Sequence, residues 1–377
     1  MSEPVKSVLI VAGESSGELY GALLAEELRK MYPDVNILGV GGERMRAAGV
    51  DVFREVSGAF GLVEAVSHLK DLKKTMDALI RKAEEERPPV AVLIDFPDFN
   101  FKAAAELKKR GVKILYYVSP QIWAWRADRI KKMARLVDKM ALILPFEQEI
   151  YRKAGIPSEF VGHPVLDEIA GFSGKTVEKE GREKILALLP GSRPSELKRH
   201  LPLMADVLRM FKREFPEWGF RIPLAPNLKT DSFNGQLRAL RDEGAVIKKE
   251  NALKVLSFCD AAVIASGTAT LQAAFLERPF TVVYRLSPIT FMLGRLLVKV
   301  KHVSLVNILS GREAVREFLQ KDARPENVMA ELRRLIKDPG YRASMIAEFV
   351  RVRDMFSGRS ASRHTASMVS GMAGWGR

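Results

Sequence analysis

The feature that most constrains the fold of this chain is a regular alternation of short apolar runs with amphipathic stretches. The apolar runs have the length of buried strands, and the stretches between them, such as residues 22–31 and 103–109, have helical spacing. Strands that alternate with helices in this way form a parallel sheet covered by helices on both faces. The predicted strands are residues 8–12, 35–40, 90–95, 114–118 and 140–144, followed by 185–189, 219–223, 245–247, 261–265 and 281–284.

A polar, charged and glycine-bearing segment, GFSGKTVEKEGREK, interrupts this alternation at residues 171–184 and is typical of an interdomain linker. A chain of 377 residues is also long for a single domain. We therefore predict an α/β protein with two doubly wound, Rossmann-like domains, at 1–170 and 185–345, which face each other across a ligand-binding cleft. Residues 346–377 are expected to form a helix that crosses back to the first domain or packs on a partner chain, with an end that frays.

Composition excludes several classes of protein. The single cysteine, Cys259, rules out an internal disulfide framework and is expected to be buried. The five histidines show no metal-ligand spacing, so no metal site is predicted. Residues 1–6 are polar and no apolar run is long enough to span a bilayer, so neither a signal peptide nor a membrane span is expected. The net charge of +14 favours anionic partners, but no nucleic-acid-binding motif is present.

Two carboxylates, one at the end of the predicted strand 90–95 and one just after it, occur in the sequence IDFPDFN. The carboxyl ends of parallel strands are where open sheets bind ligands. Asp98 lies beyond Pro97 and further out of the strand, so it is the better candidate for a general base. Asp95 is expected to cap or orient backbone, and structural hydrogen bonding remains an alternative for both residues.

The next predicted strand runs into SPQIWAWR, which holds two of the four tryptophans. Trp123 and Trp125 either line a cleft for an acyl chain or sugar, or brace the domain interface. Both interpretations remain open.

Three further loops follow strands. Glycines and helix starts in GESSGE (residues 13–18) allow close approach of a ligand, but Glu14 and Glu18 would repel phosphate, so we expect this loop to contact a sugar or an acceptor hydroxyl. A tight turn is the alternative.

In the second half, PGSRPSE (residues 190–196) places Arg193 where backbone amides converge, which suits a phosphate, although a surface ion pair is possible there. The turn SGTATLQ (residues 266–272) enters a helix and offers a seat for a diphosphate, or is a plain helix cap.

Taken in order, nine motifs resemble those of the lipid-A-disaccharide synthases, which are glycosyltransferases of the GT-B architecture with two Rossmann-like domains. The resemblance covers nearly the whole chain. The motifs are VAGESSGE (11–18), IDFPDFN (94–100), YYVSPQIWAWR (116–126), LPFE (144–147), VGHPVLD (161–167), LLPGSR (188–193), ASGTATLQ (265–272), VVYR (282–285) and VSLVNIL (303–309).

This resemblance implies a reaction. A UDP-linked 2,3-diacylglucosamine gives its sugar to the 6-hydroxyl of 2,3-diacylglucosamine 1-phosphate (lipid X), with inversion, which yields a β-1,6-linked disaccharide 1-phosphate and UDP. The family needs no cofactor and no metal, in agreement with the missing DxD-type motif. The first domain is implied to face the acceptor and the second to bind the UDP-sugar; a homodimer is compatible with the family.

The resemblance also implies residue roles. Asp98 would activate the acceptor hydroxyl, and Arg193 would balance the charge of departing UDP. One departure is Gln272, which stands where the family often has a glutamate for the ribose hydroxyls; the first loop also ends in Glu18 where aspartate is common. The donor site would comprise Gly191, Ser192, Arg193, Ser266, Gly267, Thr268, Gln272 and Asn307, and the sugar or acceptor loop Glu14, Ser15 and Ser16.

Because both substrates carry acyl chains, a membrane contact is expected. Residues 61–76 place apolar side chains at helical spacing beside lysines, which suits an interfacial helix on the anionic inner face of the inner membrane, with the protein otherwise cytoplasmic. A core-facing helix would show the same stripe. Residues 288–301 are a second candidate, with core packing as the alternative. The predicted membrane contacts are Leu62, Val66, Leu69, Leu72 and Lys73.

Two other functions compete with this interpretation. Another enzyme of the same architecture, a UDP-N-acetylglucosamine 2-epimerase or a peptidoglycan N-acetylglucosaminyltransferase, would share the diphosphate seat but not YVSPQIWAWR. A basic scaffold without activity would explain the net charge, but neither the paired anion loops nor the carboxylates at a strand end.

Overall fold

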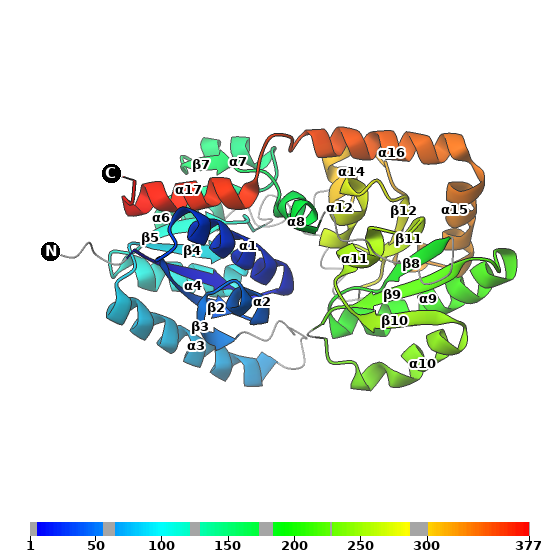
Figure 1. Cartoon of the computed structure of the whole chain (residues 1–377), viewed down its shortest axis with the longest axis horizontal. Helices are drawn as coiled ribbons and strands as arrows, with labels where there is room; N and C mark the ends of the chain where they lie inside the picture. The colour runs from blue at the N-terminus through cyan, green and yellow to red at the C-terminus, as the bar shows by residue number, and fades with distance from the viewer. Residues whose placement is uncertain are drawn as a thin grey trace. The chain divides into compact units, whose positions relative to one another are not determined.

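A computed structural model describes residues 6–55, 65–120, 129–172, 184–226, 228–286 and 301–376. The chain divides into two compact units. The first unit consists of Met1–Glu168 and Phe356–Arg377, and the second of Ile169–Met355. The last residues of the chain therefore belong to the same unit as the first ones (Figure 1).

The first unit is built on a parallel seven-stranded sheet with the order β3-β2-β1-β4-β5-β6-β7. The chain begins in the middle of the sheet at β1, moves outward to β3, returns beside β1 with β4 and continues to the opposite edge. This path is a doubly wound sheet. Its strands are β1 (Ser7–Ala12), β2 (Asn36–Gly41), β3 (Asp51–Glu55), β4 (Val90–Ile94), β5 (Lys113–Tyr117), β6 (Lys139–Leu142) and β7 (Ser158–Phe160).

The second unit repeats the plan with a parallel six-stranded sheet, in the order β10-β9-β8-β11-β12-β13. Here the chain starts at β8 and reverses between β8 and β11. The predicted fold class, two doubly wound parallel sheets, is confirmed. The strands are β8 (Ile185–Leu189), β9 (Gly219–Leu224), β10 (Ala245–Lys249), β11 (Ala261–Ala265), β12 (Phe280–Tyr284) and β13 (Glu317–Leu319).

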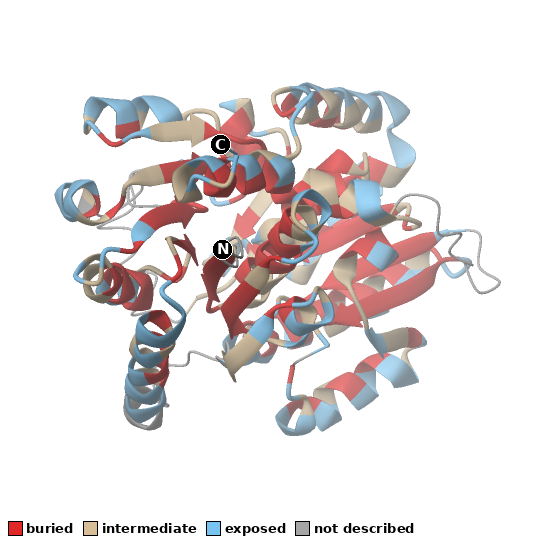
Figure 2. Cartoon of the chain, turned by 60° about the vertical axis from the view of Figure 1, so that its left-hand side comes forward, coloured by how far each residue is buried: buried red, intermediate tan, exposed pale blue. Residues whose placement is uncertain are grey.

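Helices cover both faces of each sheet, and the strands between them are buried. The central strands β1, β4, β8 and β11 have no exposed residue, as continuous apolar runs in a parallel sheet predict. Figure 2 shows most of the strands in red and the outer helix surfaces in pale blue. Burial on both faces therefore explains why these runs lack the polar alternation of a half-exposed strand.

The helices of the first unit begin with a long α1 directly after the first loop. They are α1 (Ser15–Met31), α2 (Glu43–Ala47), α3 (Ala65–Glu86), α4 (Pro97–Lys108), α6 (Arg129–Leu136), α7 (Glu147–Lys153), α8 (Pro164–Phe172), which ends in the second unit, and α17 (Ala361–Ala373).

The second unit has two 3-10 helices among its α-helices. Its helices are α9 (Pro194–Glu214), η1 (Asp231–Phe233), α10 (Asn234–Asp242), α11 (Ala252–Leu256), α12 (Thr268–Phe275), α14 (Leu305–Ser310), η2 (Gln320–Asp322), α15 (Pro325–Lys337) and α16 (Pro339–Asp354).

The end of the chain does not fray, so that prediction is wrong. Helix α17 packs against α1, β4 and β5 of the first unit. Its side chains Ala361, Thr365 and Val369 are fully buried, because they recur at helical spacing and cover one face of the sheet. Most of the predicted linker, residues 173–183, lies outside the described residues.

Candidate functional site

Four of the five loops that the sequence singled out, all except the one after β5, lie at the two points where strand order reverses. In the first sheet, β1 and β4 are neighbours in a register that pairs Ala12 with Ile94, so the loops at 13–16 and 95–98 begin side by side. In the second sheet, β8 and β11 are neighbours and Leu189 pairs with Ile264. Ligands of doubly wound sheets bind outside the carboxyl ends of the strands at these points.

The turn that carries Asp98 has an unusual backbone. Asp95 and Phe96 both adopt the left-handed conformation, each with a φ of 47°. Side chains other than glycine rarely take this conformation, and two in succession mark a turn that its surroundings hold in place. Pro97 then starts α4, and Asp98 is exposed at the second position of that helix, whereas Asp95 is half-buried.

Hydrogen bonds hold the carbonyl groups of this turn. The side-chain amide of the buried Asn100 donates to the carbonyl oxygens of Ile94 (3.2 Å) and Asp95 (2.8 Å). The hydroxyl of Tyr116 donates to the same Asp95 oxygen at 2.6 Å. These hydrogen bonds orient the backbone of Asp95 from two sides. The turn that carries Asp98 is therefore held in a fixed conformation.

The first loop supplies polar groups that are partly accessible. Glu14, Ser15 and Ser16 are all half-buried where β1 leads into α1. Glu18 has a different task, because its Oε1 atom accepts a hydrogen bond of 2.7 Å from the backbone nitrogen of Arg44 and so caps the short helix α2. Of the two glutamates in this loop, Glu18 is thus engaged by α2, whereas Glu14 precedes α1 and follows β1, the neighbour of β4.

The end of β5 contains a buried polar cluster that the sequence analysis missed. The hydroxyl of Ser119 donates to Oε1 of Glu147 at 2.7 Å and accepts from the hydroxyl of Tyr151 at 2.9 Å. Burial raises the pKa of Tyr151, so it stays a donor. The preceding Val118 is left-handed, with a φ of 63°. The motifs YVSP and LPFE are thus two sides of one contact, a pairing that their separation in the sequence concealed. Trp123 and Trp125 lie outside the described residues.

In the second unit, the backbone amides of the PGSR loop converge on a carboxylate of the chain itself. Oε2 of Glu196 accepts from the amides of Ser192 (2.8 Å) and Arg193 (3.2 Å). Gly191 has a φ of +111°, and a Cβ atom there would lie closer than 3.0 Å to Glu196, so only glycine fits. The predicted use of these amides for a phosphate is therefore not what this structure shows. Glu196 stands three residues after Arg193, the spacing of a capping box, which is the signal that could have found it.

Arg193 itself remains accessible. Its side chain is 43% exposed, and Nη1 lies 3.7 Å from Oε1 of Glu196. A guanidinium is the side chain best suited to a phosphate, and here a fixed carboxylate lies close to it. The side chain of Arg193, more than the backbone around it, is therefore the candidate anion-binding group of this loop.

The turn at the end of β11 leads into a helix whose first amides have no acceptor among the described residues. Gly267 is exposed, and the structure describes no acceptor for the backbone amides of Thr268 and Ala269 in the first turn of α12. Amides of this kind at a helix start favour an anion. The hydroxyl of Ser266 donates to the carbonyl oxygen of Val303 at 3.1 Å. Gln272 is buried one turn further along the helix, with 6% of its surface exposed.

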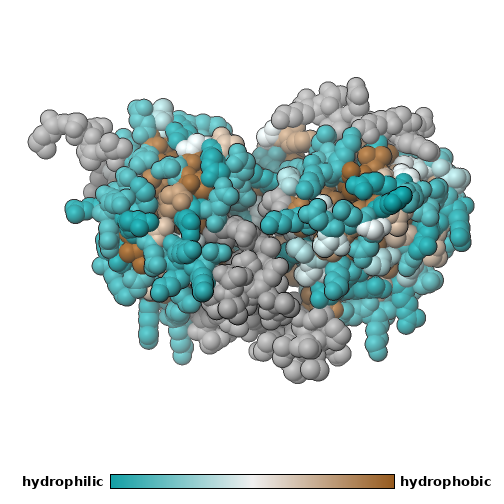
Figure 3. Space-filling view, turned by 90° about the horizontal axis from the view of Figure 1, so that it is seen from below, coloured by the Kyte–Doolittle hydropathy of each residue, from teal (hydrophilic) through white to brown (hydrophobic). Residues whose placement is uncertain are grey.

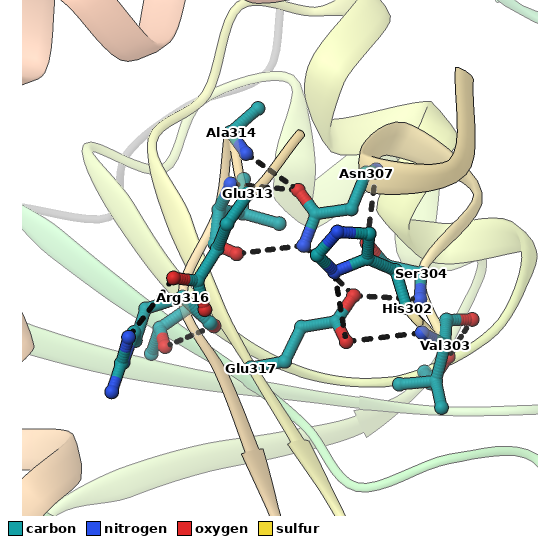
Figure 4. Close-up of polar contacts among 11 residues, drawn as sticks. His302, Val303, Ser304, Asn307, Glu313, Ala314, Arg316 and Glu317 are labelled. Carbon is teal, nitrogen blue, oxygen red and sulfur yellow. Dashed lines mark hydrogen bonds and ion pairs between the residues drawn. The ribbon is translucent and has the colours of Figure 1, made fainter. Parts of the chain in front are cut away.

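Asn307 lies beneath the loop that follows, fully buried (Figure 4). Its side-chain nitrogen donates to the carbonyl oxygen of Val315 and to Oε1 of Glu317, both at 2.8 Å. Its oxygen accepts from the amides of Ala314 and Val315. Every hydrogen-bonding position of the amide is thus used within the chain. The structure places Asn307 as a support for this loop and not on an accessible surface.

Glu317 extends this support to the SGT turn. Its carboxylate accepts from the backbone amides of Val303 (3.0 Å) and Ser304 (2.9 Å) as well as from Asn307. Since Val303 in turn accepts from Ser266, a continuous chain of hydrogen bonds runs from β13 to the end of β11. The sequence carried no signal for Glu317, because its partners become neighbours only after folding.

His200 forms a similar brace. Its Nε2 atom accepts from the backbone amide of Arg285 at 3.0 Å, and its Nδ1 atom lies 2.8 Å from the carbonyl oxygen of Pro190. The imidazole therefore joins the ends of β8 and β12. Burial lowers its pKa, which keeps Nε2 free to accept.

The proposed membrane helix α3 is only partly described. Leu62 and the side chains of Val66 and Leu69 lie outside the described residues. Leu72 is partly buried and packs against the core of the first unit, whereas Lys73 is exposed. The lower surface of the molecule, seen in Figure 3, is mainly hydrophilic where it is described.

Within the described ranges, no helix is long and apolar enough to cross a bilayer. No group of three or more histidine, cysteine, aspartate or glutamate side chains within the same ranges is arranged to hold a metal ion.

Comparison with known proteins decides the family. A family model described as lipid-A-disaccharide synthetase matches residues 8–364. The chain belongs to this family. A lipid-A-disaccharide synthase of Geobacter metallireducens is 37% identical, with 98% of each chain covered. One from Anaeromyxobacter dehalogenans is 40% identical over 97% of each. Family membership makes the chain an enzyme, and the activity of the family is the synthesis of a lipid A disaccharide.

Solved structures show the same fold at much lower identity. A putative UDP-N-acetylglucosamine 2-epimerase from Listeria monocytogenes has a TM-score of 0.71 at 11% identity, with 97% of this chain and 96% of that chain covered. A glycotransferase of kitacinnamycin has a TM-score of 0.64 at 15% identity, with 98% and 99% covered. These likenesses confirm the GT-B architecture.

Proposed function

We propose that the protein transfers 2,3-diacylglucosamine from its UDP derivative to the 6-hydroxyl of 2,3-diacylglucosamine 1-phosphate, with inversion, to give the β-1,6-linked disaccharide 1-phosphate and UDP. The observation that carries the proposal is the exposed carboxylate of Asp98, held by a strained turn at the first switch point of a family member. A general base must reach the hydroxyl that it deprotonates, and an accessible carboxylate on a rigid turn meets that requirement.

In the proposed step, the carboxylate of Asp98 takes the proton of the 6-hydroxyl. The oxygen then attacks the anomeric carbon, and the bond from that carbon to the diphosphate oxygen breaks as UDP leaves with its electron pair. A single displacement inverts the configuration and needs no covalent sugar–enzyme intermediate. Glu14, Ser15 and Ser16 are assigned to the acceptor or donor sugar, because their loop begins beside that of Asp98.

The second unit would hold UDP. The guanidinium of Arg193 is assigned to the charge that builds on the departing diphosphate, and the open amides at Thr268 and Ala269 to its oxygens. Gly191 and Ser192 shape the loop around Arg193, and Gln272 is assigned to the ribose. Asn307 is assigned to holding the loop above, since its amide is fully engaged. A metal ion is not part of this proposal.

The acyl chains of both substrates bring the protein to a membrane. We assign α3 to a peripheral contact with the anionic inner face of the inner membrane, because Lys73 and Lys74 are exposed on it. Each lysine close to such a surface contributes about 1 kcal/mol to binding.

The test is an assay with EDTA that mixes purified protein, the UDP-linked donor and lipid X, and follows UDP and the disaccharide product by thin-layer chromatography. The wild type should release UDP and form the disaccharide. Asp98→Asn should abolish transfer while UDP binding, measured by calorimetry, stays unchanged. Asp242→Asn is the matched control, since Asp242 is exposed on α10, and it should keep wild-type turnover.

Three outcomes would count against the proposal. Turnover by Asp98→Asn would remove Asp98 as the base. Dependence on a divalent cation would contradict metal-free transfer. Interconversion of UDP-N-acetylglucosamine without any disaccharide would favour the epimerase activity that some proteins of similar fold have.

A further inference from the structure

We infer that Phe96 is a positioning residue for the proposed reaction: its ring, wedged against Gly13, fixes the turn that presents Asp98 and couples that turn to the first loop. The inference rests on the proposed role of Asp98 and concerns what holds this carboxylate in place. Phe96 itself would touch neither substrate.

The contact with Gly13 is the first observation. A Cβ atom at Gly13 would lie closer than 3.0 Å to three carbon atoms of the Phe96 ring. The ring therefore occupies the space that any other residue at position 13 would need. Gly13 directly follows β1 and Phe96 lies two residues after β4, and these two strands are neighbours in the sheet. The two loops of this switch point meet through this contact.

The second observation is that the ring has little freedom to move aside. Phe96 is 9% exposed and belongs to the core of the first unit. Its ring stacks on that of Phe99, with centroids 5.3 Å apart and an interplanar angle of 19°. A side chain enclosed in this way fixes its own backbone, because the packing selects one rotamer.

The third observation is the strain in the backbone that this ring anchors. Phe96 has a φ of 47° and a ψ of 56°, and it directly precedes a proline, a position where helical conformations are crowded. Hydrogen bonds from Asn100 and Tyr116 hold the carbonyl of Asp95, but none of them acts on the Phe96 side chain. Without the packing of the Phe96 ring against Gly13, φ at position 96 could relax. That change would rotate the start of α4 and displace Asp98.

Such a displacement would affect the chemical step selectively. A shift of about 1 Å in a catalytic group lowers a rate on the order of a hundredfold. UDP is assigned to the second unit, so its affinity should not change. The expected signature is therefore a fall in kcat with an unchanged Kd for UDP, which a general loss of folding would not produce.

The experiment is a double-mutant cycle between the two loops. Phe96→Ala should lower kcat ten- to hundredfold, and Gly13→Ala should also lower it, because the new methyl group displaces the ring. The double variant Gly13→Ala/Phe96→Ala should be no slower than the slower single variant, since loss of the ring at position 96 leaves room for the methyl group at position 13. Phe96→Leu, a milder change that retains bulk, should fall between wild type and Phe96→Ala.

Phe160→Ala is the matched control. Phe160 is buried to the same extent, with 8% of its surface exposed, and lies on the edge strand β7, where it packs on Phe356. It should lose as much thermal stability as Phe96→Ala and keep wild-type kcat below its melting temperature. If Phe96→Ala does not fold, Phe96→Leu and Gly13→Ala supply the comparison.

The inference would be overturned by wild-type kcat in folded Phe96→Ala, by an equal loss of kcat in Phe160→Ala, or by effects of the two loop substitutions that multiply independently. These failures are distinct from failure of the proposed function. Inactive Asp98→Asn together with unaffected Phe96→Ala would reject the positioning role alone, whereas active Asp98→Asn would reject the base.

Discussion

The ring of His163 meets the ring of Phe356 edge to face, with centroids 5.9 Å apart and an interplanar angle of 90°. Tyr20 packs against the imidazole at 6.2 Å in the same manner. The contact joins the VGHPVLD motif to the segment that returns from the second unit. Two further contacts strengthen this attachment: Asp167 accepts a hydrogen bond of 2.7 Å from the amide of Ser362, and the guanidinium of Arg359 donates to the carbonyl oxygen of Phe160.

His163 should make stability depend on pH. Its Nδ1 atom accepts from the amide of Val165, and burial lowers its pKa from 6.5 to about 3. The unfolded chain therefore takes up a proton below pH 6.5 that the folded chain refuses until about pH 3. Stability should be constant with respect to this group above pH 6.5 and fall by roughly 1.4 kcal/mol per pH unit below it.

Urea unfolding of the wild type and of His163→Phe at pH 7.5, 6.0 and 5.0 measures this dependence. The variant should lose less stability on acidification than the wild type, although His200, whose pKa burial also lowers, adds to the slope in both proteins. Parallel curves for the two proteins would show that His163 does not titrate on unfolding.

Arg193 should matter more for turnover than its exposed position suggests. Arg193→Ala should reduce kcat on the order of 10²–10³-fold, because one donor to developing charge is removed. Arg193→Lys should restore little, since lysine cannot chelate two phosphate oxygens. Arg199→Ala is the matched control, because Arg199 stands on the same helix and donates to the carbonyl oxygen of Ser195. Equal turnover of Arg193→Ala and Arg199→Ala would reject the assignment.

Asn307 should contribute to the free energy of unfolding of the protein. Asn307→Leu removes the hydrogen bonds that the side chain makes to Glu317, to the carbonyl of Val315 and to two backbone amides, and we expect a loss of roughly 2–4 kcal/mol in the free energy of unfolding. Urea unfolding and UDP calorimetry on the same sample separate the two roles. Asn327→Leu, at an exposed position, should change stability by less than about 0.5 kcal/mol. Full stability with lost UDP affinity in Asn307→Leu would assign Asn307 to direct contact with the nucleotide.

The apolar side chains of α3 should fall into two groups, one that packs on the core of the first unit and one that contacts a membrane. Leu72→Ser should lower the melting temperature by a few degrees, about 2–4 °C for each kcal/mol lost, because Leu72 packs on the core. Leu69→Ser is predicted to weaken sedimentation with anionic vesicles at unchanged melting temperature. Lys73→Glu should weaken vesicle binding further at low salt. A lower melting temperature with normal vesicle binding in Leu69→Ser would return that residue to the core.

The strands that the sequence predicted well are those buried on both faces. Residues 185–189 and 261–265 agree with β8 and β11 at both ends, because such runs need no partner to be recognised. The missed strands β3, β7 and β13 are all edge strands, and they are short or polar: DVFRE, SEF and EFL. An edge strand has one neighbour and no continuous apolar run, so its pairing depends on the finished sheet.

The candidate loops were predictable because they follow buried strands, whereas most of the side chains that support them were not. Glu196 could have been found from its capping-box spacing to Arg193. Glu317 and His200 could not, since their partners are brought close only by the order of strands in the second sheet. The pairing of Gly13 with Phe96 is of the same kind: each residue is ordinary in its own motif, and the constraint arises from the neighbouring β1 and β4.

The return of Phe356–Arg377 to the first unit sets an order of events during translation. A ribosome completes all of Ile169–Met355 before it adds α17, so the second unit can fold while the first still lacks the helix that covers part of its sheet. The unit that carries Asp98 therefore completes its fold last, although most of its sequence is translated first. A nascent chain truncated within the second unit would leave this sheet face uncovered and open to chaperones and proteases.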